Sequence, residues 1–408
     1  MRNEREKVEL LAPAGSFEKL ETAIHYGADA VYLAGKRFSL RSFAENFSDD
    51  ELIEAVSLAN RNGVKVYLAL NIFPRNAQLP EIEDYLGFIG MEVHPDAIIA
   101  SDPAVIMAAR TIVPEIPLHL STQANTTNIG AVDFWHGMGV KRVNLARELS
   151  LSEVSEIAHA TEAEIEVFVH GAMCISYSGR CLLSNFLTLR GGNSGECTQS
   201  CRFSYEVVEE KRPGEYWPVV EDEHGTHIFN SRDLCMIEHV PALIESGVSS
   251  FKIEGRMKGL NYVASTIRCY RQAIDRYFEN PQCYRTDPAW LDELSRVSHR
   301  DYCTGFYFGE PRETSINYYN ATPAGVRTFV GKIIQDMGGG WYIVQVRNRI
   351  FRNDSVHLIQ KSGELQQQKV NEIVGEKYLY LESVHANDYA LMRLDSAGFL
   401  PGDLIQSC

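Results

Sequence analysis

The segment IEVFVHGAMCISYSGRCLLSNFLTLRGGNSGECTQSCR, residues 165–202, joins an apolar stretch to a cysteine-rich one. Residues 165–170 are mostly apolar and β-branched, which predicts a buried strand that ends at Gly171. Four cysteines follow with the spacing C-x6-C-x15-C-x3-C, at Cys174, Cys181, Cys197 and Cys201. Because the whole chain has only nine cysteines, this concentration indicates a shared role for the four.

Thiols gathered in this way could form disulfides, bind zinc, hold an iron–sulfur cluster or be small buried residues. The chain begins MRNEREKVELLAPAG, without an apolar signal segment, and has no apolar run that could span a membrane. We therefore expect a cytoplasmic, reduced protein, in which disulfides are disfavoured. Structural zinc usually takes two short ligand pairs, and the gap between Cys174 and Cys181 is long for one. The spacing favours a cluster over zinc, with Cys235 as the reserve fourth ligand.

Length and composition indicate an ordinary globular protein. The chain has 408 residues, enough for roughly two or three domains, with 45% apolar and 23% charged residues. Its net charge of −15 argues against a protein held to nucleic acid by bulk electrostatics, although one basic face is still compatible with RNA binding.

Outward from residues 165–202, short apolar runs alternate with amphipathic helical patterns. This alternation predicts a parallel β/α arrangement, and eight strands are the number that closes a TIM-like (β/α)8 barrel. No G-x-G-x-x-G follows any strand, so an open dinucleotide-binding sheet is disfavoured. Residues 230–247 and 259–278 are expected to be helical. The eight expected strands are 8–12, 29–34, 64–70, 96–100, 117–121, 141–146, 165–170 and 249–255.

The pattern changes near the C-terminus, where short strands alternate with turns such as MGGG. We predict a barrel domain over residues 1–284 with a cysteine-bearing insert at 171–230, a connector at 285–325 and a small all-β barrel domain at 326–408. Expected strands in the last domain include one at 377–382. Its most basic piece, VRNRIFR, carries three arginines for which we favour a solvated strand face and keep an RNA contact as the alternative: Arg347, Arg349 and Arg352.

Polar residues follow the apolar strands, at the barrel end where β/α barrels carry their chemistry. In KIEGR, Lys252, Glu254 and Arg256 alternate, so they point the same way from an extended strand. They either contact substrate or brace the barrel mouth as a charged network. His170 either fills the core or binds a sulfur or substrate. The candidate catalytic residues are Glu148, His170, Glu254 and Arg256.

The motifs of several common enzyme classes are missing from the sequence. It contains no H-E-x-x-H, no G-x-S-x-G and no phosphate-binding G-x-x-x-x-G-K-[ST]. It also lacks the C-x3-C-x2-C triplet of the usual radical SAM enzymes. A cysteine peptidase is compatible with the sequence only if His170 activates Cys174 as a nucleophile, which would remove Cys174 from a metal site.

Several motifs together resemble peptidase family U32, the collagenase-like family. They are APAGS at 12–16, EVFVHGAMCISYSGRCLLS at 166–184, the G-x-C-x-x-x-C-R run at 195–202, and KIEGRMK at 252–258 followed by YVASTIRCYRQAID. The resemblance spans roughly residues 8–280, and the C-terminal domain also fits. Length and the small β domain make the chain most similar to the members that hydroxylate the wobble uridine of tRNA.

The resemblance implies an oxygen-independent hydroxylase with a [4Fe-4S] cluster, prephenate as co-substrate and 5-hydroxyuridine as product. It implies that the chain binds tRNA and does not bind a membrane. A partner protein or a homo-oligomer is also compatible with the resemblance. The cluster ligands would be Cys174, Cys181, Cys197 and Cys201. Arg180 and Arg202, beside the ligands, would bind the cluster or a prephenate carboxylate.

Other activities of the family are open on the sequence alone. They are a collagenase-like peptidase and a hydroxylase of ribosomal RNA or of a ubiquinone precursor. A non-catalytic metal-bound binding module is a third class.

Overall fold

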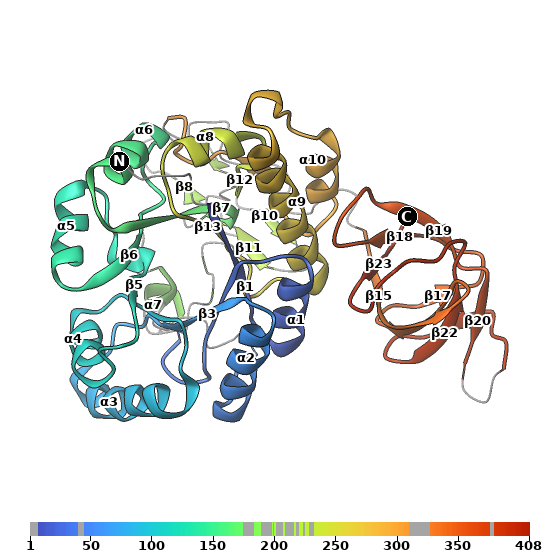
Figure 1. Cartoon of the computed structure of the whole chain (residues 1–408), viewed down its shortest axis with the longest axis horizontal. Coiled ribbons are helices and arrows are strands. Elements are labelled where there is room, and N and C mark those ends of the chain that lie inside the picture. The colour runs from blue at the N-terminus through green and yellow to red at the C-terminus, as the bar shows by residue number, and fades with distance from the viewer. Residues whose placement is uncertain are drawn as a thin grey trace.

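A computed structural model describes residues 7–39, 45–173, 232–309, 327–375 and 379–408, with short pieces between 183 and 227. Those pieces are residues 183–188, 198, 200, 207–208, 216–217, 220–222 and 225–227. Figure 1 shows a ring of helices around a barrel, with a smaller β domain beside it. None of the described helices is both long and apolar enough to cross a membrane.

The first unit is a closed barrel of eight parallel strands, as the sequence predicts. Closure is shown by β13, whose Ser250 pairs with Glu9 of β1 on one side and with Glu166 of β7 on the other. The strands are β1 (Glu9–Pro13), β2 (Ala30–Leu33), β3 (Lys65–Leu70), β4 (Ala97–Ala100), β5 (Leu118–Leu120), β6 (Val140–Asn144), β7 (Glu164–Ala172) and β13 (Ser250–Ile253).

Helices between the strands cover the outside of the barrel. Several begin at a polar cap: Ser16 accepts a hydrogen bond from the amide of Lys19, and Ser48 and Ser150 each form a capping box with a glutamate. Their apolar faces pack on the strands as one large core. These helices are α1 (Phe17–His25), α2 (Asp49–Arg61), α3 (Leu79–Phe88), α4 (Pro103–Ile112), α5 (Ile129–Gly137), α6 (Leu151–Ala160), α8 (Val240–Glu245) and α9 (Leu260–Glu279).

One helical prediction is wrong in part. Residues 233–235 of the expected helix at 230–247 form strand β12 (Asp233–Cys235), and the stretch is helical only from Ile237, as a 3-10 turn (Ile237–His239) followed by α8. β7 is longer than predicted and extends to Ala172, so its edge beyond the barrel pairs antiparallel with β12. A short apolar run has the same pattern in a buried strand and in a buried helix, and here the free edge of β7 decides. β14 (Tyr302–Cys303) then adds to β12.

The second unit is an antiparallel β domain that forms a half-barrel around its own apolar core. Its described strands form a seven-stranded sheet in the order β19-β18-β23-β15-β16-β22-β20. Of the strand expected at 377–382, residues 379–382 contribute only an isolated bridge between Tyr380 and Val374. The strands are β15 (Phe329–Gly338), β16 (Trp341–Val346), β18 (Ser355–Ile359), β19 (Gln366–Lys369), β20 (Glu372–Val374), β22 (Tyr389–Arg393) and β23 (Leu404–Ser407), with a separate pair, β17 (Ile350–Phe351) and β21 (Ser383–Val384).

The two units are joined through α1, α9 and α10 (Pro288–Ser295), a helix that lies in the predicted connector. The buried Tyr26 hydroxyl donates to the carbonyl of Ile359 at 2.7 Å and accepts from the amide of Leu404 at 3.1 Å. Arg268 of α9 pairs with Glu293 of α10 and donates to the carbonyl of Gln360 at 2.7 Å. These buried polar contacts fix the β domain against the barrel.

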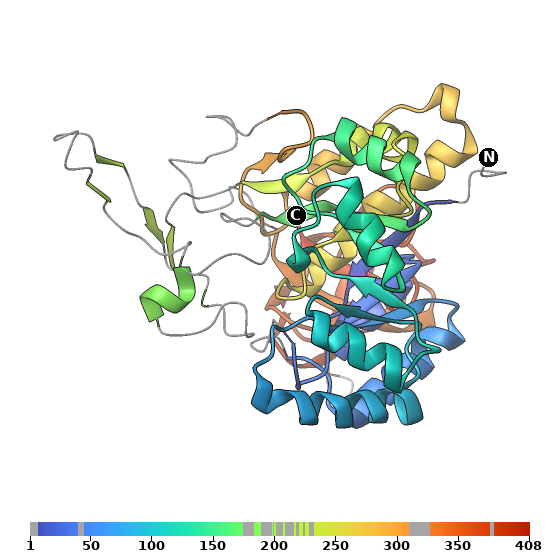
Figure 2. The same cartoon turned by 90° about the vertical axis from the view of Figure 1, so that its left-hand side faces the viewer.

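The described pieces of the insert lie to one side of the barrel. Figure 2 shows α7 (Leu183–Thr188) and the short strands β8 (Val207–Val208) to β11 (Gly225–His227), in green, standing off the ring of barrel helices. The insert leaves the barrel after β7, so it begins at the end of the barrel where the strands have their carboxyl ends.

Candidate functional site

Two glycines let the motif segments meet at the C-terminal ends of β1, β7 and β13. A Cβ on Gly15 would lie 2.2 Å from the carbonyl oxygen of Arg256, and one on Gly171 would lie 2.4 Å from that of Glu254. Gly171 also has φ +107, which disfavours other residues. The glycines of APAGS and of the VHG turn are therefore needed because KIEGR packs directly on them.

Glu254 and Arg256 lie at this mouth, each held by a neighbouring side chain. The Tyr32 hydroxyl lies 3.1 Å from the Glu254 carboxylate and 3.0 Å from the carbonyl of Ile253. Arg256 is 3% exposed, and its guanidinium donates to the Ser39 hydroxyl at 2.8 Å. These contacts orient a carboxylate and a guanidinium at the end of the same strand, where a β/α barrel binds substrate.

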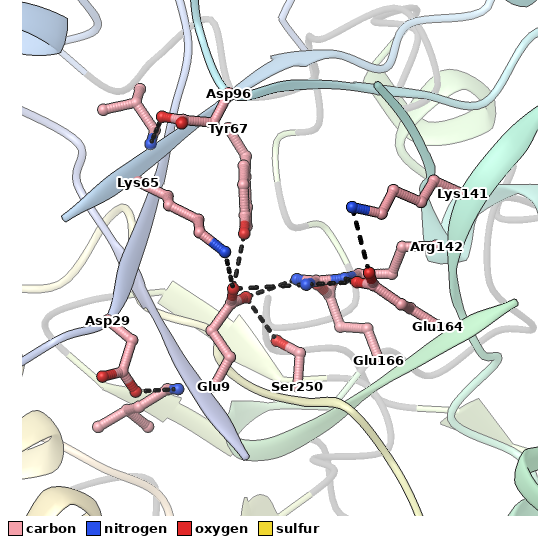
Figure 3. Close-up of polar contacts among 12 residues, drawn as sticks. Glu9, Asp29, Lys65, Tyr67, Asp96, Lys141, Arg142, Glu164, Glu166 and Ser250 are labelled. Atoms are coloured by element: carbon pink, nitrogen blue, oxygen red, sulfur yellow. Dashed lines mark hydrogen bonds and ion pairs between the residues drawn. The ribbon is translucent and has the colours of Figure 1, made fainter. Parts of the chain in front are cut away.

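Lys252 is buried and pairs with a charged network inside the barrel. Figure 3 shows Glu9, Tyr67, Arg142 and Glu166 of this network. Its ammonium lies 2.7 Å from Glu166 of β7 and 4.6 Å from the ring centroid of Tyr32. Arg142 of β6 lies 3.5 Å from Glu166 and 2.5 Å from Glu9, to which Tyr67 also donates at 2.7 Å. Most TIM barrels fill this space with branched apolar side chains. Here apolar residues share it with two buried cations and their carboxylates.

The network keeps its charges although it is buried. Burial alone would lower the pKa of Arg142, but Glu9 and Glu166 outweigh that effect and raise it. Burial and the charge of Glu9 raise the pKa of the Tyr67 phenol, so Tyr67 stays a hydrogen-bond donor. Paired, hydrogen-bonded charges of this kind are compatible with a dry interior.

His170 lies inside the core rather than at the mouth. It is 1% exposed and surrounded by the rings of Tyr262, Tyr270 and Tyr302, with centroid distances of 5.7, 5.6 and 5.2 Å. Burial lowers its pKa to about 3. A neutral, enclosed imidazole packs β7 against α9, and a direct catalytic role for His170 stays a prediction.

Arg147 and Glu148 follow the end of β6. Glu148 is half-buried there, and its role as a catalytic residue also stays a prediction. The guanidinium of the neighbouring Arg147 lies 3.9 Å from the ring centroid of Phe168 on β7. This stacked pair lies where β6 and β7 leave the barrel.

The predicted cluster ligands and their neighbours lie outside the described residues. They are Cys174, Cys181, Cys197, Cys201, Arg180 and Arg202. In the part of the chain that the structure describes, no three His, Cys, Asp or Glu side chains are grouped to hold a metal. Cys235, the reserve ligand, is described: it is 8% exposed, and burial raises the pKa of its thiol to about 12.

The arginines of the β domain make local contacts. Arg347 pairs with Glu18 of α1 at 2.7 Å, so it joins the two units. Arg349 donates to the Ser383 hydroxyl at 3.1 Å, and Arg352 lies 3.3 Å from the carboxylate of Glu382.

Sequence reasoning missed the polar residues inside the barrel. The interior positions of His119, Arg142, Asn144 and Glu166 follow from the period of two along PLHLS, KRVNLA and IEVFVH. The signal was present, because a strand buried on both faces is normally apolar throughout, and these strands carry a polar residue at alternate positions.

The fold and the polar strand ends define the active-site end of a β/α-barrel protein. The sequence profile of peptidase family U32 matches residues 15–317, and that of the peptidase family U32 C-terminal domain matches residues 327–406. The chain belongs to peptidase family U32.

Named relatives of the chain act on RNA. It is 40% identical to the tRNA hydroxylation protein P1 of Bacillus subtilis over 86% of this chain and 83% of the relative. It is 39% identical to the tRNA hydroxylation protein P of Escherichia coli over 88% of this chain and 87% of the relative. It is also 30% identical to the 23S rRNA 5-hydroxycytidine C2501 synthase of Escherichia coli, over 94% of this chain and 56% of that protein.

Proposed function

We propose that this chain is an enzyme that hydroxylates the wobble uridine of tRNA to 5-hydroxyuridine, with a [4Fe-4S] cluster and with prephenate as co-substrate. Similarity to two tRNA hydroxylation proteins over 86% and 88% of the chain carries the proposal. The similarity includes both domains and not the barrel alone, which favours these relatives over proteins that share only the fold.

The geometry of the barrel mouth supports the cluster. The backbone amide of Glu254 donates to the carbonyl of His170 at 2.9 Å, so the end of β7 lies directly beside the candidate carboxylate. Met173 is the last described residue on this path, and Cys174 follows it in the chain. Thiolates from such an insert would hold a cluster next to Glu254 and Arg256, where it would supply redox or Lewis-acid chemistry.

The environment of Cys235 makes Cys201 the better candidate for the fourth cluster ligand. A cluster ligand is a thiolate, which needs nearby positive charge or the metal itself. Cys235 lies in the apolar core on β12, and burial raises the pKa of its thiol although the Tyr270 side chain hydrogen-bonds to it. That environment suits a neutral thiol.

A peptidase mechanism has less support from the geometry. It needs His170 to take a proton from Cys174, but His170 is enclosed by tyrosines and has a pKa of about 3. An imidazole with that pKa is a weak base at neutral pH.

The substrate base must leave its stack to be reached. A barrel mouth does not admit a whole tRNA, so the base is presented from a single-stranded loop and turned into the site. The exposed arginines of the β domain, Arg349 and Arg352, lie on the unit that is fixed to the barrel and are candidates for contacts with RNA phosphates.

The test compares tRNA from a strain that lacks the gene with tRNA from strains that carry it as wild type or as Cys174→Ser. Cys283→Ser is the matched control because Cys283 is an exposed free cysteine outside the insert. We expect mass spectrometry to find 5-hydroxyuridine with the wild type and Cys283→Ser, and none with Cys174→Ser. Anaerobically purified wild type should be brown, with about four irons per chain.

Other outcomes would identify the alternatives. A modification that changes in ribosomal RNA and not in tRNA would indicate a different RNA substrate. Gelatin cleavage by metal-free protein, abolished by Cys174→Ser, would indicate the peptidase. Wild-type tRNA that is identical to deletion-strain tRNA would refute the proposed function.

A further inference from the structure

Four side chains on, or directly after, consecutive strands of the barrel each have a buried polar atom without a hydrogen-bond partner among the described residues. These atoms are Oδ1 of Asn71, Oγ of Ser101, Nδ1 of His119 and Oδ1 of Asn144. We call the four residues the polar arc. Ser101, His119 and Asn144 are 2, 6 and 2% exposed. Since these atoms have almost no contact with solvent, bulk water does not supply the missing hydrogen bonds.

Strand register places the arc on one side of the barrel interior. Leu70 pairs with Ala100, so Asn71 follows β3 at the level where Ser101 follows β4. Ala100 pairs with Leu120, and Leu120 with Val143, which brings Asn144 of β6 to the same level.

His119 belongs to the same interior face at the next level down. It pairs with Ile99 on one side and with Arg142 on the other. Arg142 points into the barrel in Figure 3, and residues two apart on a strand share a face. Asn144 therefore points inward as well, closer to the mouth than Arg142.

The arc is neutral. Asparagine and serine carry no charge, and His119 is held as the free imidazole because burial and the charges of Arg142 and Lys252 push its pKa well below the usual value. The nearest buried cations are already paired with Glu166 and Glu9. A carboxylate or phosphate placed here would lose its hydration without gaining a free cation.

Two flat groups lie near the arc toward the mouth. Phe168 is two residues beyond Glu166 on β7 and so shares the interior face, and Arg147 stacks on its ring. A planar, uncharged ring with alternating donors and acceptors would satisfy the amides, the hydroxyl and the imidazole, and an aromatic face nearby suits such a ring.

We propose that the polar arc of Asn71, Ser101, His119 and Asn144 binds the hydrogen-bonding edge of a pyrimidine base. The inference rests on the proposed function for the identity of the base, a uracil presented by RNA.

Two substitutions separate a binding role from a structural one. Ser101→Ala and Asn144→Leu each remove an unsatisfied buried group, so the ligand-free protein should unfold at the same temperature as the wild type or higher. Each should nevertheless reduce 5-hydroxyuridine in tRNA of the complemented strain by roughly ten-fold or more, as expected for a lost buried hydrogen bond. Asn62→Ala, at an exposed helix end, is the matched control and should leave the modification unchanged.

Direct binding is measured by saturation-transfer NMR with free uridine as the probe. Uridine signals should respond with the wild type and Asn62→Ala, and not with Asn144→Leu. If the wild type restores 5-hydroxyuridine and both arc variants restore it equally well, the arc inference is wrong and the proposed function stands. If the wild type restores no modification, the proposed function fails. In that case the arc inference is still supported if the wild type binds uridine and Asn144→Leu does not. It is overturned if the wild type does not bind uridine.

Discussion

The ion pair between Lys252 and Glu166 is expected to be a main source of barrel stability that depends on both partners. The two charged groups are 2.7 Å apart, with side chains 5 and 3% exposed. Lys252→Met keeps the length and most of the apolar stem of the side chain but leaves the Glu166 carboxylate without its nearest cation. Removing one partner of a buried pair typically costs about 3–5 kcal/mol.

The structure places the expected value at the lower end of that range. Arg142, 3.5 Å from Glu166, still compensates part of the carboxylate's charge in the variant. A loss of about 3 kcal/mol corresponds to a fall of roughly 6–12 °C in the unfolding temperature of a large domain. Thermal unfolding followed by circular dichroism measures this shift.

Two variants test the electrostatic reasoning. Lys252→Met combined with Glu166→Gln leaves no unpaired charge and should recover most of the lost stability. Lys65→Met removes a lysine that is 60% exposed and 3.8 Å from Glu9, and should change the unfolding temperature by about 1 °C or less. The reasoning is refuted if Lys252→Met and Lys65→Met unfold at the same temperature. It is also refuted if the double variant is less stable than Lys252→Met alone.

Three further substitutions have defined outcomes. Gly15→Ala should sharply lower the soluble yield and the unfolding temperature, because its Cβ would lie 2.2 Å from a backbone carbonyl oxygen. Gly87→Ala is the control: it lies in a helix with open space around it and should stabilise the protein by about 0.5–1 kcal/mol. Thermal melts under identical conditions compare the two variants. Burial alone would raise the pKa of Asp233, but Arg300 and Lys258 hold it below its usual 3.8. The ionised carboxylate therefore stabilises the fold fully above pH 3.8, and this stabilisation is lost as the pH falls through the lowered pKa. Urea titrations should therefore show Asp233→Asn less stable than wild type at neutral pH, with the gap narrowing below about pH 4; a gap independent of pH contradicts this. Tyr26→Phe leaves the amide of Leu404 unpaired between the domains and should cost about 1–3 kcal/mol in the same assay; an unchanged urea midpoint contradicts this.

The barrel was predictable because each strand and helix carries its own local signal. Runs such as VKVYLAL and DAIIA are too short for helices and are separated by capped amphipathic segments, and the observed strands differ from the predicted ones by only a few residues at their ends. The strand β12 was not predictable in this way, because it forms only where the extended edge of β7 lies beside it. The polar strand β19, with the sequence QQQK, likewise depends on its pairing with β18.

The candidate site was predictable in position and less so in detail. Glu254 and Arg256 were located by the rule that chemistry sits at strand ends, and both lie at the mouth. The partner of Lys252 was not predictable, because the pairing with Glu166 depends on barrel closure between β7 and β13. Alternation along one strand shows which side chains share a face, but only the closed sheet shows which strand faces them.

The charges of the barrel interior assign different ligands to different parts of the site. Glu9 and Glu166 balance Arg142 and Lys252, so this network compensates itself and leaves no positive charge for an anionic ligand. The polar arc beside it is uncharged and suits a base. The two carboxylates of the proposed co-substrate, prephenate, therefore need cations from outside the network. Among the described residues, Arg147 and Arg256 follow the ends of β6 and β13 and are the candidates for binding those carboxylates. Arg180 and Arg202 of the cysteine insert lie outside the described residues.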